Sequence, residues 1–163
     1  FGPIKLRTTP LDQAVMTMGP MYRRFQKKYD VDVLNTVFLT DGGSNPTTKT
    51  GDCRSVDRAT KNNPYYMTDA YTKTTSVYTD TGLTMALVDK LKKVYNMNVM
   101  NFHIADKVDD VRRMPSLFNV ENISPSNVQS EGYATGKSKL GFDDVYVVNP
   151  GVIRNITRSD DVE

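Results

Sequence analysis

The feature that most constrains the fold is the stretch from Val33 to Gly43, which reads Val-Leu-Asn-Thr-Val-Phe-Leu-Thr-Asp-Gly-Gly. This run is short, rich in β-branched and aromatic residues, and closed by two glycines, so it predicts a strand of a parallel sheet with both faces covered. In open α/β sheets, ligands bind in the crevice beyond the carboxyl ends of the strands. Asp41 stands at that end of the predicted strand, so we expect a ligand site there.

Helices and strands alternate along the chain. Thr9-Pro10-Leu11-Asp12 predicts the start of a helix that Pro20 should kink or split. A second amphipathic helix over residues 82–94 leads into a strand over 97–104. This order predicts a three-layer, doubly wound α/β fold with a mainly parallel sheet, in one domain over residues 1–163.

The C-terminal third gives weaker signals. Residues 108–114 predict a short helix stopped by Pro115, and residues 116–131 look irregular. Residues 132–138 resemble a phosphate-binding loop, but only three residues separate its glycines where four are needed, so we expect a flexible polar loop. Residues 145–148 predict a strand, and residues 150–163 a tail.

Residues 42–78 form a polar insertion that is longer than the usual connection in a compact domain. It carries tyrosines interleaved with lysines, of which Lys61, Tyr65, Tyr66 and Tyr71 are the candidates for contact with a partner or a nucleic acid. Packing of these residues in a loop or β-hairpin is the alternative.

Composition indicates no particular class of function. With 21 basic and 19 acidic residues, the charge balance does not indicate a nucleic-acid or membrane surface, and no apolar run approaches the ~20 residues that span a bilayer. The single cysteine, Cys53, forbids an internal disulfide, so we expect a cytoplasmic protein. His103 is the only histidine, and without a partner set we expect it to pack in the sheet and not to act as a catalytic base. An enzyme whose catalytic half lies upstream of Phe1 stays an alternative.

Thr9 and Asp41 form the candidate metal site. A hydroxyl at a helix entrance and a carboxylate at the next strand's end can meet at one edge of a sheet, and such hard oxygen donors suit Mg²⁺. The alternative is that Thr9 caps the helix and Asp41 only turns the chain.

Residues 9–14 (Thr-Pro-Leu-Asp-Gln-Ala) and 37–42 (Val-Phe-Leu-Thr-Asp-Gly) resemble two metal-site segments of the von Willebrand factor A family, over about residues 5–106. The resemblance implies a metal-ion-dependent adhesion site in which Thr9 and Asp41 take two of the ligand positions. The Asp-x-Ser-x-Ser loop of that family is missing from this sequence, and the chain begins at Phe1. We therefore expect either the C-terminal part of such a domain or a divergent domain with an incomplete Mg²⁺ site.

By this resemblance, the leading function is metal-assisted protein–protein interaction without turnover, within a larger assembly. The alternative is a nucleic-acid-associated accessory domain that binds through the tyrosines and lysines of the insertion.

Overall fold

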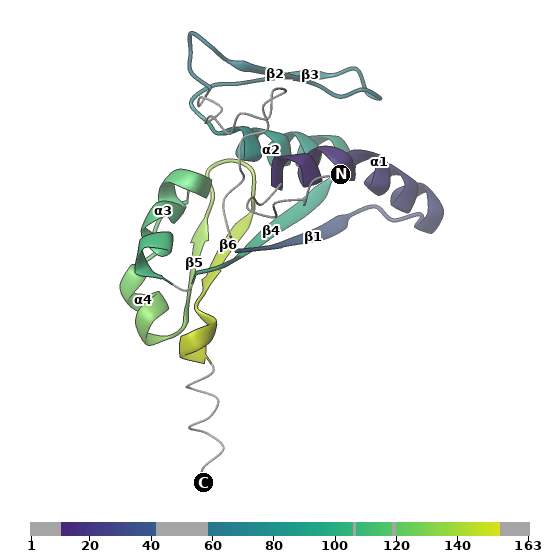
Figure 1. Ribbon diagram of the computed structural model, residues 1–163. Helices are drawn as coiled ribbons and strands as arrows, with labels where there is room; N and C mark the ends of the chain where they lie inside the picture. The colour runs from purple at the N-terminus through teal and green to yellow at the C-terminus, as the bar shows by residue number, and fades with distance from the viewer. Residues whose placement is uncertain (1–10, 42–58, 106, 119, 154–163) are drawn as a thin grey trace, which may run out of the picture.

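The computed structural model describes residues 11–41, 59–105, 107–118 and 120–153 (Figure 1). The fold is α/β: a four-stranded, mostly parallel sheet flanked by helices. Its elements, in chain order, are α1 (Leu11–Tyr29), β1 (Leu34–Thr40), β2 (Tyr65–Thr68), β3 (Thr75–Tyr78), α2 (Leu83–Tyr95), β4 (Met97–Ile104), α3 (Val108–Phe118), α4 (Pro125–Ser130), β5 (Tyr133–Lys137) and β6 (Asp144–Val148).

The main sheet has the strand order β1-β4-β6-β5. Strands β1, β4 and β6 are parallel, with Leu34 opposite Met97 and Asn101 opposite Val145. Strand β5 pairs with β6 in the antiparallel sense, and β1 lies at the other edge. The predicted parallel sheet is thus confirmed for the two pairings that join β1, β4 and β6, because the helices between these strands carry the chain back to the same end.

Helices α1 to α4 all pack on one face of this sheet. Their buried side chains belong to one apolar cluster with the inward side chains of the strands. In that cluster Phe118 of α3 contacts the ring of Phe142 edge to face, and Phe142 contacts Phe38 of β1 in the same way. Among the described residues, no helix covers the opposite face, so the predicted third layer is not seen in this part of the chain.

Two prolines lie inside helices, against expectation. Helix α1 continues through Pro20, and the predicted split does not occur. Helix α3 continues to Phe118 although Pro115 was expected to stop it. In both helices the apolar stripe packs on each side of the proline, as Val15 and Tyr22 do in α1, and this burial outweighs the one hydrogen bond that a proline removes.

The segment from Pro125 to Lys137 was wrongly expected to be irregular and then a flexible loop. It forms α4 and β5 instead. Gly136 explains the strand, because a Cβ at this position would lie 2.4 Å from Cγ1 of Val120 and 2.7 Å from the carbonyl oxygen of Glu121. The glycine permits a close approach of two backbones that hydropathy patterns do not reveal.

The described part of the polar insertion forms an antiparallel hairpin of β2 and β3 beside α2 (Figure 1). Lys90 of α2 holds it: its Nζ donates to the Thr74 carbonyl oxygen (2.9 Å), the Thr74 hydroxyl (3.0 Å) and the Ser76 hydroxyl (3.1 Å). Tyr78 of β3 also donates to Asp89 at 2.8 Å. Through these bonds the hairpin is anchored to the helix layer.

None of the helices in the described residues combines the length and the apolar character needed to cross a membrane.

Candidate functional site

The carboxyl end of β1 places Thr40 and Asp41 beside the end of β4. Thr40 is buried, and it lies opposite His103 in the sheet register. Asp41 follows the strand and is exposed to solvent. Thr9, the other predicted metal ligand, lies outside the described residues, so the pairing of Thr9 with Asp41 stays a prediction.

Two polar side chains of β4 lie buried next to this end of the sheet. Asn101 is 0% exposed and His103 is 2% exposed. Within the described residues, neither the amide nitrogen nor the amide oxygen of Asn101 has a hydrogen-bond partner, and Nδ1 of His103 has none either. Buried polar atoms are normally paired with protein or with ordered water. The sequence interpretation did not single out Asn101.

Burial also has the largest effect on the pKa of His103. It lowers the pKa of the imidazole below its ordinary value of 6.5, while the carboxylates of Asp110 and Asp41 act weakly in the opposite direction. The ring packs edge to face on Phe118, with centroids 5.7 Å apart. His103 therefore packs in the sheet, as expected, but it is fully buried where a satisfied or half-buried side chain was expected, and it lies within electrostatic reach of Asp41.

The chemistry available at this end of the sheet is hydrogen bonding. The described residues contain no group of three or more His, Cys, Asp or Glu side chains placed to hold a metal ion. Asp41 contributes one oxygen-donor residue, which suits only an ion that keeps most of its water. The residues described here do not by themselves form a Mg²⁺ site.

The candidate contact residues of the insertion lie on or beside the hairpin. Lys61 precedes β2 and is exposed, Tyr66 is 70% exposed, and Tyr65 is half-buried opposite Tyr78. Tyr71 lies in the turn, where one face of its ring is covered by the guanidinium of Arg23 at 3.8 Å from the centroid. Only Tyr66 therefore offers a largely free aromatic ring in this group.

The sheet face opposite the helices is the most unusual surface of the described structure. Leu39 is 73% exposed and Val37 is 56% exposed. The register of β4 and β6 places further apolar side chains on the same face, all of them half-buried. We call this surface the open sheet face; its apolar residues are Val37, Leu39, Met100, Phe102, Ile104, Tyr146 and Val148.

The open sheet face has an apolar centre and a polar rim. In the centre, the rings of Phe102 and Tyr146 stack at 4.4 Å with an interplanar angle of 8°. At one end, Asn98 donates a hydrogen bond to Asn35 at 3.0 Å, and at the β5 side Lys137 pairs with Asp144. An apolar centre inside a polar rim is the usual anatomy of a protein–protein interface.

The sequence of β1 contains a signal for this surface. In β1 the inward residues Leu34 and Phe38 alternate with Val37 and Leu39, so both faces of the strand carry apolar side chains. Such a strand is typical of a sheet covered on both sides. The structure covers one side with its own helices, and the other side keeps the composition of a buried surface.

No protein-family model matches the chain, and neither a curated protein nor a solved structure matches it. The resemblance to the von Willebrand factor A family rests on the short segments around Thr9 and Asp41 and stays a prediction.

Proposed function

We propose that this chain is a protein-interaction module whose partner covers the open sheet face. One observation carries the proposal. The exposed face of a mainly parallel sheet bears apolar side chains of the kind found in a protein core, and Val37 and Leu39 are the most exposed of them. Contiguous apolar patches on soluble proteins mark interaction sites, because leaving them in water is unfavourable.

The partner that suits this face is a helical protein element with an apolar stripe. Parallel sheets are normally covered on both faces, and the covering elements are helices. Four strands spaced about 4.8 Å apart are roughly 14 Å across, which matches one or two helices of about 10 Å diameter. A partner of this kind would supply the third layer of the doubly wound fold that the sequence predicts.

A selection experiment tests this proposal directly. The protein is used to select binders from a displayed library of amphipathic helical peptides, and each binder is titrated into protein with ¹³C-labelled methionine methyl groups. The expected result is a saturable shift of the Met100 methyl signal, which reports on the open sheet face, with the Met16 and Met67 signals unchanged. Leu39→Lys should weaken these peptides at least tenfold, since it places a charge in the apolar centre.

The matched control is Val77→Lys, because Val77 is a similarly exposed strand residue, at 57%, on the hairpin. This variant should bind the peptides as the wild type does. Two results would overturn the proposal: selected peptides that leave Met100 unchanged, or a homodimer of the wild type that Leu39→Lys dissociates, which would make a second copy the occupant.

The metal-assisted form of this function has its own test. Asp41 lies beyond the carboxyl end of β1, where a Mg²⁺ ion would join the module to a partner's carboxylate. Addition of Mg²⁺ should shift the amide signals of Thr40 and Asp41, and Asp41→Asn should abolish the shift. If neither amide signal responds at millimolar Mg²⁺, interaction through this module does not involve the metal.

Nucleic-acid binding through the hairpin is the second candidate, and the exposed ring of Tyr66 together with the exposed Lys61 favours it. This function predicts binding of single-stranded nucleic acid that falls steeply with salt. Filter binding at low and at physiological salt, with Tyr66→Ala as the variant, measures it. Absence of binding at low salt would remove this candidate.

A further inference from the structure

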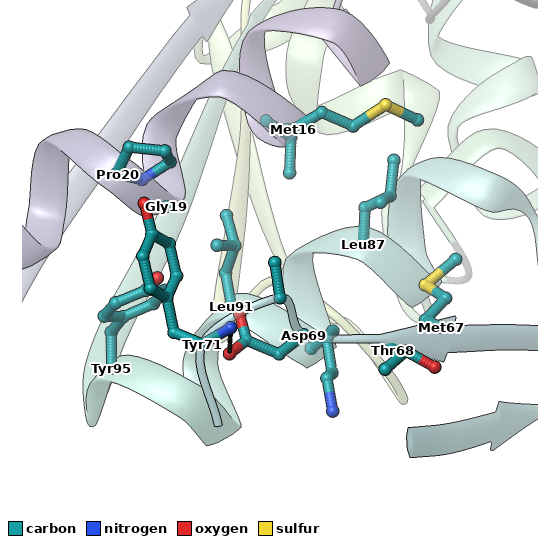
Figure 2. A pocket seen from close by; sticks show the side chains of 13 residues that line it. Met16, Gly19, Pro20, Met67, Thr68, Asp69, Tyr71, Leu87, Leu91 and Tyr95 are labelled. Atoms are coloured by element: carbon teal, nitrogen blue, oxygen red, sulfur yellow. Dashed lines mark hydrogen bonds between the residues drawn. The ribbon is translucent and has the colours of Figure 1, made fainter. Parts of the chain in front are cut away.

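A pocket of about 280 Å³ lies on the other side of the molecule, between α1, α2 and the hairpin (Figure 2). Residues of α1 form one wall, residues of α2 the second, and the end of β2 with the following turn the third. This pocket is separate from the open sheet face, because α1 and α2 pack on the opposite side of the sheet. Binding of a ligand in this pocket therefore does not depend on whether a partner covers the open sheet face.

The walls of the pocket are mainly apolar. Figure 2 shows Met16, Leu87 and Met67 around one end, and the rings of Tyr71 and Tyr95 at the other. Methionine side chains adapt to the shape of a guest and make favourable contacts between sulfur and aromatic rings. Two tyrosine rings add edges and faces against which a further ring can pack.

Two charged atoms in the lining, Oδ1 of Asp69 and Nζ of Lys90, already hold hydrogen bonds within the hairpin or to it. Oδ1 of Asp69 accepts hydrogen bonds from the backbone amides of Tyr71 (3.0 Å) and Thr72 (2.6 Å) and from the Thr72 hydroxyl (2.9 Å). Nζ of Lys90 donates to three oxygens of Thr74 and Ser76, which matches its three protons. An anionic guest would have to displace the bonds of Lys90 and would meet the Asp69 carboxylate, so the pocket favours a neutral guest over an anion.

Gly19 contributes to the depth of the pocket. A Cβ at this position would lie 3.1 Å from the Tyr95 hydroxyl, so the absent side chain lets the tyrosine ring lie against α1. The cation of Arg23 covers the Tyr71 ring from outside at 3.8 Å and helps to hold that ring at the pocket's end.

We propose that this pocket binds a small, neutral aromatic molecule about the size of two fused rings. An apolar cavity of about 150 Å³ holds benzene, so a volume of about 280 Å³ accommodates a bicyclic ring. The methionine and tyrosine lining selects an aromatic guest over an aliphatic one, and the engaged Lys90 ammonium beside the Asp69 carboxylate disfavours an anion, so the guest is neutral.

Indole is the probe for the test, with protein labelled at the methionine methyl groups. The expected result is a saturable shift of the Met16 and Met67 methyl signals, since the ring current of a bound aromatic shields methyl groups above its face and deshields those at its edge. The Met100 signal on the open sheet face and the Met85 and Met114 signals in the core should not move.

Met16→Trp and Met21→Trp form a matched pair for locating the guest. Both methionines lie exposed on α1, at 50% and 65%, but only Met16 lines the pocket. Met16→Trp should fill the pocket with its own indole ring and weaken probe binding, followed at Met67, at least tenfold, whereas Met21→Trp should leave it unchanged. The proposal is overturned if Met16 and Met67 do not respond saturably up to the solubility of indole, if Met100 shifts equally, or if both tryptophan variants bind alike.

Discussion

At the scale of single residues, the buried polar side chains of β4 are the feature that stability does not explain. An unpaired buried polar group costs about 1–3 kcal/mol, and both Asn101 and His103 carry such atoms. Their position beside Asp41 at the carboxyl end of the parallel strands makes this end of the sheet the second region, after the open sheet face, in which to look for binding.

His103 should give the protein a measurable pH dependence. Its pKa is lowered from 6.5 by burial in the folded state, so the unfolded chain takes up a proton as the pH falls below 6.5 while the folded chain does not. As the pH decreases below 6.5, the free energy of unfolding should therefore decrease, by at most about 1.4 kcal/mol per pH unit from this residue. Above pH 6.5, His103 should contribute little to the pH dependence of the free energy of unfolding. Urea unfolding at about pH 7.5 and about pH 5.5 measures the change.

The comparison for this prediction is His103→Leu, which cannot take up a proton. The variant should lose less stability between the two pH values than the wild type, whatever its absolute stability. Equal losses in the two proteins would show that His103 binds the same number of protons folded and unfolded.

At the scale of elements, the hairpin of β2 and β3 depends on a lysine of another element. Lys90 is buried and gives all three of its hydrogen bonds to Thr74 and Ser76. Lys90→Met keeps the aliphatic stem but leaves these oxygens without the ammonium group, and it should loosen the hairpin. We expect faster hydrogen exchange of the amides over Thr75–Tyr78, by about tenfold or more, with no change over Met97–Ile104.

Lys73→Met is the control at this scale, because Lys73 lies exposed in the turn of the same hairpin. Its exchange pattern should match that of the wild type. Faster exchange throughout the sheet in Lys90→Met would instead mean that the lysine stabilises the whole fold and not the hairpin alone.

At the scale of the whole molecule, the open sheet face should be dispensable for folding but should dominate the exposed apolar surface. In the double variant Val37→Thr, Leu39→Thr, the β-branched threonine keeps the strand propensity and removes apolar surface that is already in water. We expect the free energy of unfolding to change by less than about 1 kcal/mol, while the fluorescence of a bound anilinonaphthalene dye falls at least twofold. Val77→Thr on the hairpin should leave the dye signal nearly unchanged.

A large loss of stability in the double variant would contradict this picture, since it would place Val37 and Leu39 in the core of the isolated chain. An unchanged dye signal would show that the open sheet face is not the surface at which apolar molecules collect.

The local pattern of apolar residues was sufficient to predict the long helices and strands. The apolar periodicity of Leu83–Tyr95 and the composition of Leu34–Thr40 and Met97–Ile104 predict their type and nearly their bounds, because each buries a continuous stripe or face of its own. The parallel pairing followed from the order of these elements. The same patterns placed Asp41 after the end of a strand, where the structure has it.

Tertiary packing decided the rest. Pro115 remains helical and β5 exists because contacts with distant residues outweigh local preference, as the close approach of Gly136 to Val120 illustrates. The sequence by itself determined that β1 carries apolar side chains on both faces. Only the tertiary structure decided which face the helices cover, because alternation along a strand fixes which residues share a face and says nothing of what packs against it. That choice leaves Val37 and Leu39 in solvent and gives the chain its open sheet face.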